Sequence, residues 1–169
     1  MYLSTEDLLS HKGYHFFPQS VDIEYLHEQG SGELNDDVIL IDGTTIGVFD
    51  GATSLSSTRF TGGKSGGLLA AEIAADCFKD TRDLQSAALQ ANRQIGIAQQ
   101  EYSVHLADRV ERWSTSMAVV RMGDDSFEYC QSGDAQILVI YEDGNSQVIT
   151  SDFDHDRETL TIWKELGGD

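Results

Sequence analysis

Residues 35–51 read NDDVILIDGTTIGVFDG, a stretch that predicts a β-hairpin. The continuous apolar run Val38–Ile41 is short enough for a buried strand. Asp42-Gly43 is a hairpin turn signal, and Thr45–Phe49 then alternates as a second strand would. In an antiparallel pair, the start of the first strand lies beside the end of the second. The hairpin is therefore expected to bring three carboxylates together at one end: Asp36, Asp37 and Asp50.

The residues around the hairpin predict an α+β domain. Residues 1–19 form a lead-in with a short helix, and residues 20–169 form the domain, which begins with a strand over Ser20–Leu26. Apolar residues at helical spacing predict a helix around Leu69–Cys77 and a longer one over Leu84–Leu106. Short runs rich in β-branched and aromatic residues then predict strands, and a last helix follows them. These segments are Ser116–Met122, Phe127–Gln131, Ile137–Tyr141, Gln147–Thr150 and the helix Arg157–Leu166. This order predicts layers of helix and mostly antiparallel sheet.

The two central helices each present an apolar stripe, which we expect to be buried against a sheet. The stripes include Leu69, Ile73, Ile95, Ala98 and Tyr102. If Ile95 is fully buried, Ile95→Ala costs about 2–5 kcal/mol of stability. Gly96 weakens the second helix by about 1 kcal/mol relative to alanine.

The composition excludes several classes of protein. Hydrophobic residues make up 40% of the chain, which is too many for a disordered one. The formal net charge of -18 would repel a polyanion, so we expect no nucleic-acid partner. No run approaches the roughly 20 apolar residues of a membrane helix, and the N-terminus lacks the order of a signal peptide. We therefore expect a cytoplasmic protein with no membrane partner, in which Cys77 and Cys130 are buried free thiols.

Two interpretations of the converging carboxylates stay open at this point. Asn, Asp and Gly favour turns, so turn formation alone explains these residues. The alternative is a site for hard divalent cations, which prefer carboxylate, carbonyl and water oxygens. Asp50-Gly51 supplies a carboxylate that can bridge two ions and a backbone carbonyl beside it. Asp36 and Asp37 point to opposite faces of a strand, so we expect only one of them to bind directly.

Several motifs, in order along the chain, resemble those of the metal-dependent type 2C serine/threonine phosphatases. Residues 35–37 (NDD) and 47–51 (GVFDG) resemble the family's Asn-Glu-Asp and Phe-(Gly/Ala)-Val-Phe-Asp-Gly. Residues 114–118 (STSMA) are similar to its Gly-(Ser/Thr)-Thr-Ala strand, and residues 132–135 (SGDA) to its Gly-Asp-Ser turn. Residues 150–155 (TSDFDH) resemble its Thr-x-Asp-His segment, and residues 166–168 (LGG) the Gly-Gly after the next helix.

The resemblance implies a four-layer αββα sandwich, in which helices flank two antiparallel β-sheets, and two bound Mg²⁺ or Mn²⁺ ions. Asp50 matches the family's bridging aspartate, Gly51 its carbonyl ligand, and Asp36 the acidic residue on the other side of the site. Asp37 matches the aspartate beside it, which is either a ligand or a group behind the ligands. Asp134 matches an aspartate of a weaker third metal site in some members.

Three departures from the family pattern bear on activity. The family's phosphate-contacting Arg falls at Gly32, so Lys64 or Arg59 would have to replace it. Residues 51–54 read GATS where the family has Gly-His-Gly-Gly. The family's later metal ligands, an Asp-Gly and an Asp-Asn, have no counterpart before Asp169. We therefore expect the chain to be the N-terminal part of a longer protein.

The resemblance to type 2C phosphatases implies hydrolysis of a phosphomonoester, with phosphoserine or phosphothreonine on a protein as the expected substrate. A metal-activated water would attack phosphorus without a covalent enzyme intermediate. His15 or His27 is a candidate general acid, beside its plainer interpretation as a satisfied surface side chain. Two alternatives stay open: a non-catalytic regulatory or binding module with the type 2C fold, and an unrelated metal hydrolase of small phosphorylated molecules.

Overall fold

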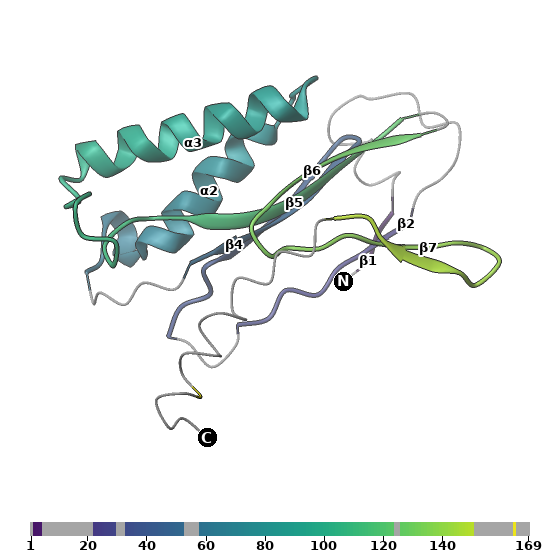
Figure 1. The fold of residues 1–169 in the computed structure, drawn as a ribbon, viewed down its shortest axis with the longest axis horizontal. Helices are drawn as coiled ribbons and strands as arrows, with labels where there is room; N and C mark the ends of the chain where they lie inside the picture. Colours follow the sequence, from purple (N-terminus) through teal and green to yellow (C-terminus); the bar gives the residue numbers. More distant parts are fainter. Residues whose placement is uncertain are drawn as a thin grey trace.

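A four-stranded antiparallel sheet forms the centre of the molecule (Figure 1). The computed structural model describes residues 2–4, 22–29, 33–52, 58–123, 126–150 and Lys164. The strands of the central sheet lie in the order β3-β4-β5-β6, each antiparallel to its neighbour. They span Asp37–Asp42, Thr45–Gly51, Thr115–Met122 and Phe127–Ser132.

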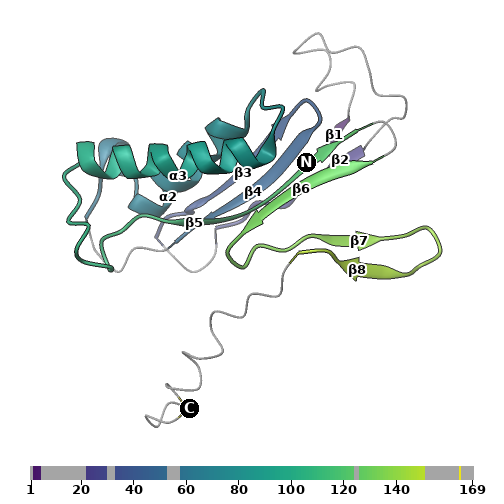
Figure 2. The same cartoon turned by 45° about the horizontal axis from the view of Figure 1, so that its top comes forward.

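Two short antiparallel strand pairs accompany the central sheet. Strand β1 (Tyr2–Ser4) pairs with β2 (Asp22–Glu24), and β7 (Leu138–Ile140) pairs with β8 (Ser146–Val148). The β7–β8 pair lies on the side of the sheet away from the helices (Figures 1 and 2). The predicted lead-in therefore contributes a strand, whereas the short helix predicted within it lies outside the described residues.

The predicted hairpin is confirmed as β3 and β4. Their register runs from Asp37 opposite Asp50 to Asp42 opposite Thr45, with a tight turn between the strands. Gly43 occupies that turn with a φ of 57°, a left-handed conformation that glycine adopts without steric cost. The local sequence therefore sets both the turn and the end of the sheet at which the acids gather.

Helices α2 (Gly66–Phe78) and α3 (Leu84–Glu101) cover one face of the sheet (Figures 1 and 2). A short 3-10 turn, η1 (Thr61–Gly63), precedes α2. Both helices begin at capping side chains that accept backbone N–H groups of the first turn: Ser65 for α2 and Asp83 for α3. The second helix ends at Glu101 and does not reach Leu106 as predicted, because Ser103 turns the chain with a φ of 55°.

The buried face of α2 differs from the predicted one. Leu69 and Ile73 are only half-buried, and the helix instead buries its small residues and Phe78. The buried set is Gly66, Gly67, Ala70, Ala71, Ala74, Ala75 and Phe78. Small side chains let a helix approach a sheet closely, and Phe78 meets Phe49 of β4 with ring centroids 5.7 Å apart. Close approach, rather than the spacing of large residues, decides this face.

The predicted buried face of α3 is also wrong. Ile95 and Ala98 are half-buried and Tyr102 is 39% exposed, whereas the apolar residues that α3 buries are Leu84, Ala87 and Ala91. The expected cost of Ile95→Ala therefore falls below the range of about 2–5 kcal/mol that applies to a fully buried site.

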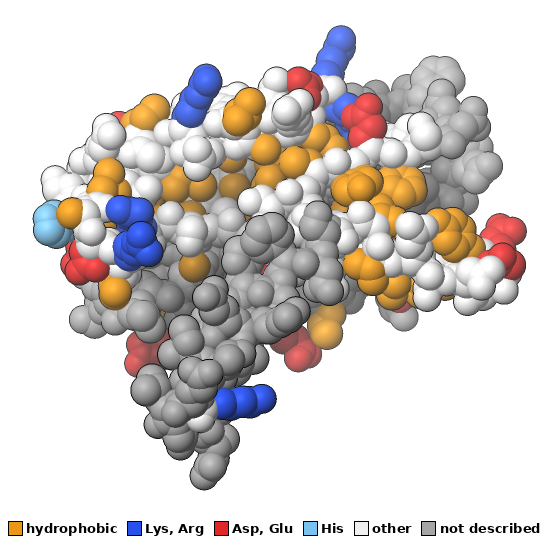
Figure 3. All heavy atoms as spheres, in the orientation of Figure 1, with side chains coloured by type: hydrophobic (Ala, Val, Ile, Leu, Met, Phe, Trp, Pro, Cys, Tyr) orange, Lys and Arg blue, Asp and Glu red, His pale blue; other side chains and the backbone are white. Residues whose placement is uncertain are grey.

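The α+β class, with antiparallel sheets flanked by helices, is confirmed. Of the helix predicted over Arg157–Leu166, only Lys164 is described, and it is helical. Cys77 and Cys130 are free and half-buried, and burial raises the pKa of both thiols. Figure 3 shows exposed apolar side chains over β6 and the β7–β8 pair. The exposed large hydrophobic residues include Phe127 of β6 and Leu138 and Ile140 of β7. Within the described ranges, no helix is long and apolar enough to cross a membrane.

Candidate functional site

Asp37, Asp50 and Ser116 form a row across three neighbouring strands. Asp50 of β4 lies opposite Asp37 of β3 on one side and opposite Ser116 of β5 on the other. Directly opposite residues of antiparallel strands project from the same face, with Cβ atoms about 4.5–5.5 Å apart. Phe49 packs on Phe78 of α2, so strand alternation places Asp50 and its row on the face away from the helices.

Asp134 extends this row beyond β6. Strand β6 ends at Ser132, which pairs with Met117, so Gly133 lies against Ser116 of the row. A Cβ at Gly133 would lie 2.4 Å from the Cβ of Ser116, and the φ of Gly133 is 78°. Only glycine fits this turn without strain. The turn brings Asp134 close enough for its charge to act on Asp50.

Asp50 is the electrostatic centre of the cluster. Partial burial raises its pKa above 3.8, and the negative charges of Asp37, Asp134 and Asp36 raise it further. A hydrogen bond between the side chains of Asp37 and Asp50 acts in the same direction, because it favours a shared proton.

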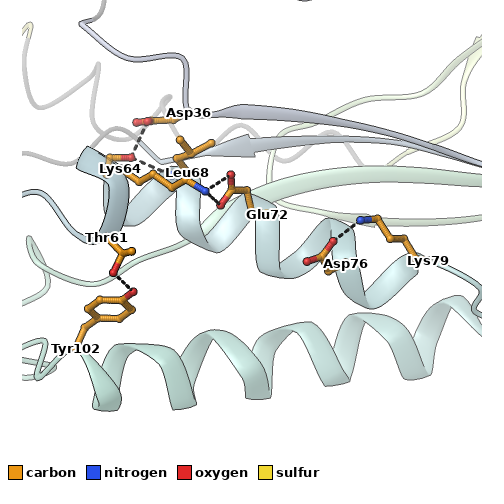
Figure 4. Close-up of polar contacts among 9 residues, drawn as sticks. Asp36, Thr61, Lys64, Leu68, Glu72, Asp76, Lys79 and Tyr102 are labelled. Atoms are coloured by element: carbon orange, nitrogen blue, oxygen red, sulfur yellow. Dashed lines mark hydrogen bonds and ion pairs between the residues drawn. The ribbon is translucent and has the colours of Figure 1, made fainter.

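Asp36 lies at the same end of the hairpin, but its carboxylate turns toward α2. The hydroxyl of Ser65 donates to Asp36 Oδ1 over 2.6 Å and also accepts the backbone N–H of Leu68 (Figure 4). Ser65 therefore ties Asp36 to the start of α2. Asp36 and Asp37 therefore face different surroundings, as strand alternation predicts, and Asp37 is the one that lies directly opposite Asp50.

Gly51 is required where α2 meets the end of β4. A Cβ there would lie 2.5 Å from the carbonyl oxygen of Asp36 and 2.5 Å from the carbonyl carbon and oxygen of Gly67. The Gly51 N–H donates to the Asp36 carbonyl over 3.2 Å, and the Thr115 hydroxyl donates to the Asp50 carbonyl over 2.9 Å. These bonds hold the backbone on both sides of the Asp50 side chain.

The cations proposed to replace the family's arginine differ in their surroundings. Lys64 donates to both carboxylate oxygens of Glu72 over 2.7 Å, and both side chains are partly buried (Figure 4). Arg59 makes a longer contact of 3.4 Å with Glu33, whose side chain is 91% exposed. Gly32 itself lies outside the described residues.

His27 lies beside the start of β3. Its Nε2 is 3.2 Å from the Asp37 carbonyl oxygen and 3.0 Å from Asn35 Nδ2, while Asn35 Oδ1 accepts the Asp37 N–H. These contacts position the backbone that carries Asp37. A general-acid role for His27 stays a prediction, and His15 lies outside the described residues.

The ligand atoms at this end of the sheet are oxygens, the type that a hard divalent cation prefers. They belong to the carboxylates around Asp50, whose mutual repulsion a bound cation would relieve, with the Gly51 carbonyl beside them. Within the described residues, however, no three His, Cys, Asp or Glu side chains stand in an arrangement that could hold a metal ion. The described residues therefore supply only part of such a site. Asp152 and Asp154 lie outside the described residues.

Two residues of the site were missed by the sequence reasoning. Ser116 Oγ is buried and has no hydrogen-bond partner in the described part of the chain, although it stands beside Asp50. Ser65 both caps α2 and holds Asp36. The alternation of β5 could have placed Ser116 on the face of Asp50, but only if the pairing of β4 with β5 had been known.

The fold is of the α+β class, and the candidate site is an acidic cluster at the end of a β-hairpin. The family model described as Protein phosphatase 2C matches residues 27–165, and the chain belongs to this family. No curated protein matches the chain.

Solved structures share the fold. The chain is similar to the Mycobacterium tuberculosis serine/threonine phosphatase PstP/Ppp, with 16% identity and a TM-score of 0.57, over 79% of this chain and 54% of that one. The catalytic domain of the serine threonine protein phosphatase PstP in complex with 2 manganese ions matches with 16% identity and a TM-score of 0.56, over 79% of this chain and 55% of that one. The chain thus spans about half the length of these structures.

Stability of the metal-free chain is expected to fall as the pH rises through the raised pKa of Asp50. The folded state binds this proton more tightly than the unfolded state, so the contribution is complete below 3.8 and is lost above the folded value. Asp83 affects stability in a different pH range. Hydrogen bonds from Ser86 lower its pKa, so its contribution to folding stability is lost only below pH 3.8. Urea unfolding in chelator between pH 3.8 and neutrality should show the decline, and Asp50→Asn should flatten it. An unchanged slope in the variant would contradict the assignment.

Proposed function

We propose that this chain carries part of a metal-dependent phosphatase that hydrolyses phosphomonoesters, with phosphoserine or phosphothreonine on proteins as substrate. Family membership supports the class of reaction. The observation that carries the proposal for this chain is the convergence of Asp36, Asp37 and Asp134 on Asp50, which raises its pKa. Carboxylates gathered in this way favour a divalent cation.

The proposed metal-holding residues are Asp50 at the centre, the carbonyl of Gly51, and the acids that flank them, Asp36, Asp37 and Asp134. Mg²⁺ and Mn²⁺ both suit this oxygen donor set. When bound, such an ion supplies a Lewis acid that lowers the pKa of water and offsets charge on the phosphoryl oxygens.

The protein's own groups prepare this site in three ways. Asp37 lies directly opposite Asp50 across the β3–β4 pair, so the two carboxylates are already adjacent. Ser65 orients Asp36 through a 2.6 Å bond, and Thr115 holds the Asp50 carbonyl. These contacts limit the reorganisation that cation binding requires.

Nucleophilic chemistry at cysteine is disfavoured for this chain. A phosphatase that uses a cysteine nucleophile needs a thiolate, and lowered pKa values are typical of reactive thiols. Burial raises the pKa of both Cys77 and Cys130, and both pack against the apolar core. The two cysteines are therefore structural, which favours attack by water.

Arg59 is the better candidate for the cation that contacts the substrate phosphate. Arg59 lies 3.4 Å from the carboxylate of Glu33, which is exposed, and exposed ion pairs are weak. Lys64, in contrast, is held by both carboxylate oxygens of Glu72. We expect Arg59→Gln to weaken binding of a phosphoserine peptide about three- to tenfold, as loss of one charge-assisted contact would. Lys64→Gln should change it less. Calorimetric titration measures both, and a larger effect at Lys64 would reverse the assignment.

The 169-residue chain by itself is expected to bind Mn²⁺ or Mg²⁺ weakly, at no more than one site, with almost no turnover. The physical reason is that its described acids form no closed group of three ligands. Calorimetric titration with Mn²⁺, alongside release of phosphate from a phosphothreonine peptide, measures both quantities. The same assays on a longer gene product containing this chain should show Asp50-dependent turnover. Two tight sites and strong turnover in the short chain would contradict the expectation.

Two observations favour a second function. Ser65 already donates to Oδ1 of the Asp36 carboxylate, and no metal-binding trio is formed among the described side chains. A non-catalytic binding module with the phosphatase fold would look the same. Phosphopeptide binding without turnover, in a longer product as well as in this chain, would establish this alternative and overturn the first.

A further inference from the structure

A small pocket with an aromatic wall lies behind the acidic end of the sheet. Phe60, Tyr102 and Trp113 form the wall, with ring centroids 4.6–5.4 Å apart and ring planes inclined by 51–73°. Trp113 is buried, and Tyr102 is anchored by a 2.6 Å hydrogen bond with Thr61 (Figure 4). The backbone connects this wall to the site, because Ser114, next to Trp113, accepts the N–H of Ala52 over 2.9 Å.

The rim of the pocket is polar and carries one acid. Thr58, Ser103 and Glu111 line it, and all three are exposed. Within the described residues, the Glu111 carboxylate has no ion pair with a Lys, Arg or His side chain. The two neighbouring arginines have other partners than Glu111. Arg59 contacts Glu33, and Arg112 Nε donates to the Leu106 carbonyl over 2.7 Å. The pocket therefore combines aromatic rings with an acid that has no ion-pair partner among the described residues.

The size of the pocket restricts its occupant. The cavity measures about 80 Å³, whereas a single water needs only about 10–15 Å³. This space suits a short chain of atoms, such as the end of a long side chain, better than a whole ring system. Aromatic faces attract ammonium and guanidinium groups, and a carboxylate at the rim adds Coulomb attraction. The net charge of -18 further favours a cationic ligand over an anionic one.

We propose that this pocket binds the charged end of a lysine or arginine side chain from a protein ligand. The aromatic wall contacts the cation and its methylene stem, and Glu111 pairs with the charge. A ligand held in this way would lie beside the end of the sheet that carries Asp50. The proposal requires neither a metal nor phosphatase activity.

The test uses the metal-free 169-residue chain and matched blocked amino acids. N-acetyl-arginine methylamide is compared with N-acetyl-citrulline methylamide, and N-acetyl-lysine methylamide with its norleucine analogue. Titrations followed by ¹H–¹⁵N NMR should move the Trp113 indole N–H signal and the amide signals of Ser103 and Val104. We expect each charged probe to bind about fivefold more tightly than its neutral partner. The arginine and lysine arms show which cation the pocket prefers.

Variants distinguish binding in the pocket from attraction by the overall negative charge of the chain. Glu111→Gln should remove the preference for charged probes, whereas Glu142→Gln, at an exposed acid of the β7–β8 turn, should keep it. Tyr102→Leu should weaken binding while Tyr102→Phe retains it, with circular dichroism confirming that both variants fold. Equal binding of charged and neutral probes, no binding, or signal changes centred on Asp50 would overturn the proposal. An equal loss in Glu142→Gln would do the same, because it would assign the attraction to overall charge.

Discussion

Manganese is expected to raise the free energy of unfolding of this chain, and Asp50→Asn is expected to abolish that effect. Asp50 is the carboxylate on which the other acids of the cluster converge, so its loss removes the central ligand. With free Mn²⁺ about ten times above its dissociation constant, binding to the folded state stabilises it by about 1.4 kcal/mol. Urea unfolding with and without Mn²⁺ measures the difference, with Glu142→Gln as the control for loss of one negative charge.

The same variant should act in the opposite direction without metal. Asparagine cannot ionise, so Asp50→Asn removes the repulsion by Asp37, Asp134 and Asp36 that raises the Asp50 pKa. The gain should stay below about 1 kcal/mol, because solvent screens these partly exposed charges. A variant that is less stable in chelator yet still stabilised by Mn²⁺ would contradict the role of Asp50 in both states.

Gly51→Ala is expected to destabilise the fold by about 3 kcal/mol or more, the upper end of the cost of overpacking. The new Cβ would lie 2.5 Å from backbone atoms of Asp36 and Gly67, which cannot rotate away as a side chain can. Either the start of α2 or the end of β4 must move. The movement would also displace Asp50, so Mn²⁺ binding should weaken together with stability.

Gly96→Ala is the matched control for this change. Gly96 lies inside α3 and a Cβ there would meet nothing within 4 Å. Alanine should therefore stabilise the helix by about 0.5–1 kcal/mol. Thermal and urea unfolding of both variants give the comparison. A Gly51→Ala variant as stable as the wild type would show that α2 does not approach β4 this closely.

The hairpin could be predicted because its signals are local. An apolar run, an Asp-Gly turn and a second alternating run determine the register, which in turn places Asp37 opposite Asp50. The helix faces could not be predicted in the same way. Spacing of large residues indicated Leu69 and Ile73, but the helix packs through Ala70 and Ala74. Which stripe is buried depends on how closely the sheet approaches, and that distance is not a local property.

The sequence by itself determined the two central helices, the strand order of the hairpin and the end of the sheet at which acids gather. The tertiary structure alone decided which neighbour each of those acids faces. Asp36 turns to Ser65 because α2 begins beside it, and Asp37 faces Asp50 because β3 pairs with β4. Asp134 joins them because β5 pairs with β6 and Gly133 closes against Ser116. Local patterns specify the faces of each element, whereas contacts between elements distant in sequence exist only once the sheet has formed.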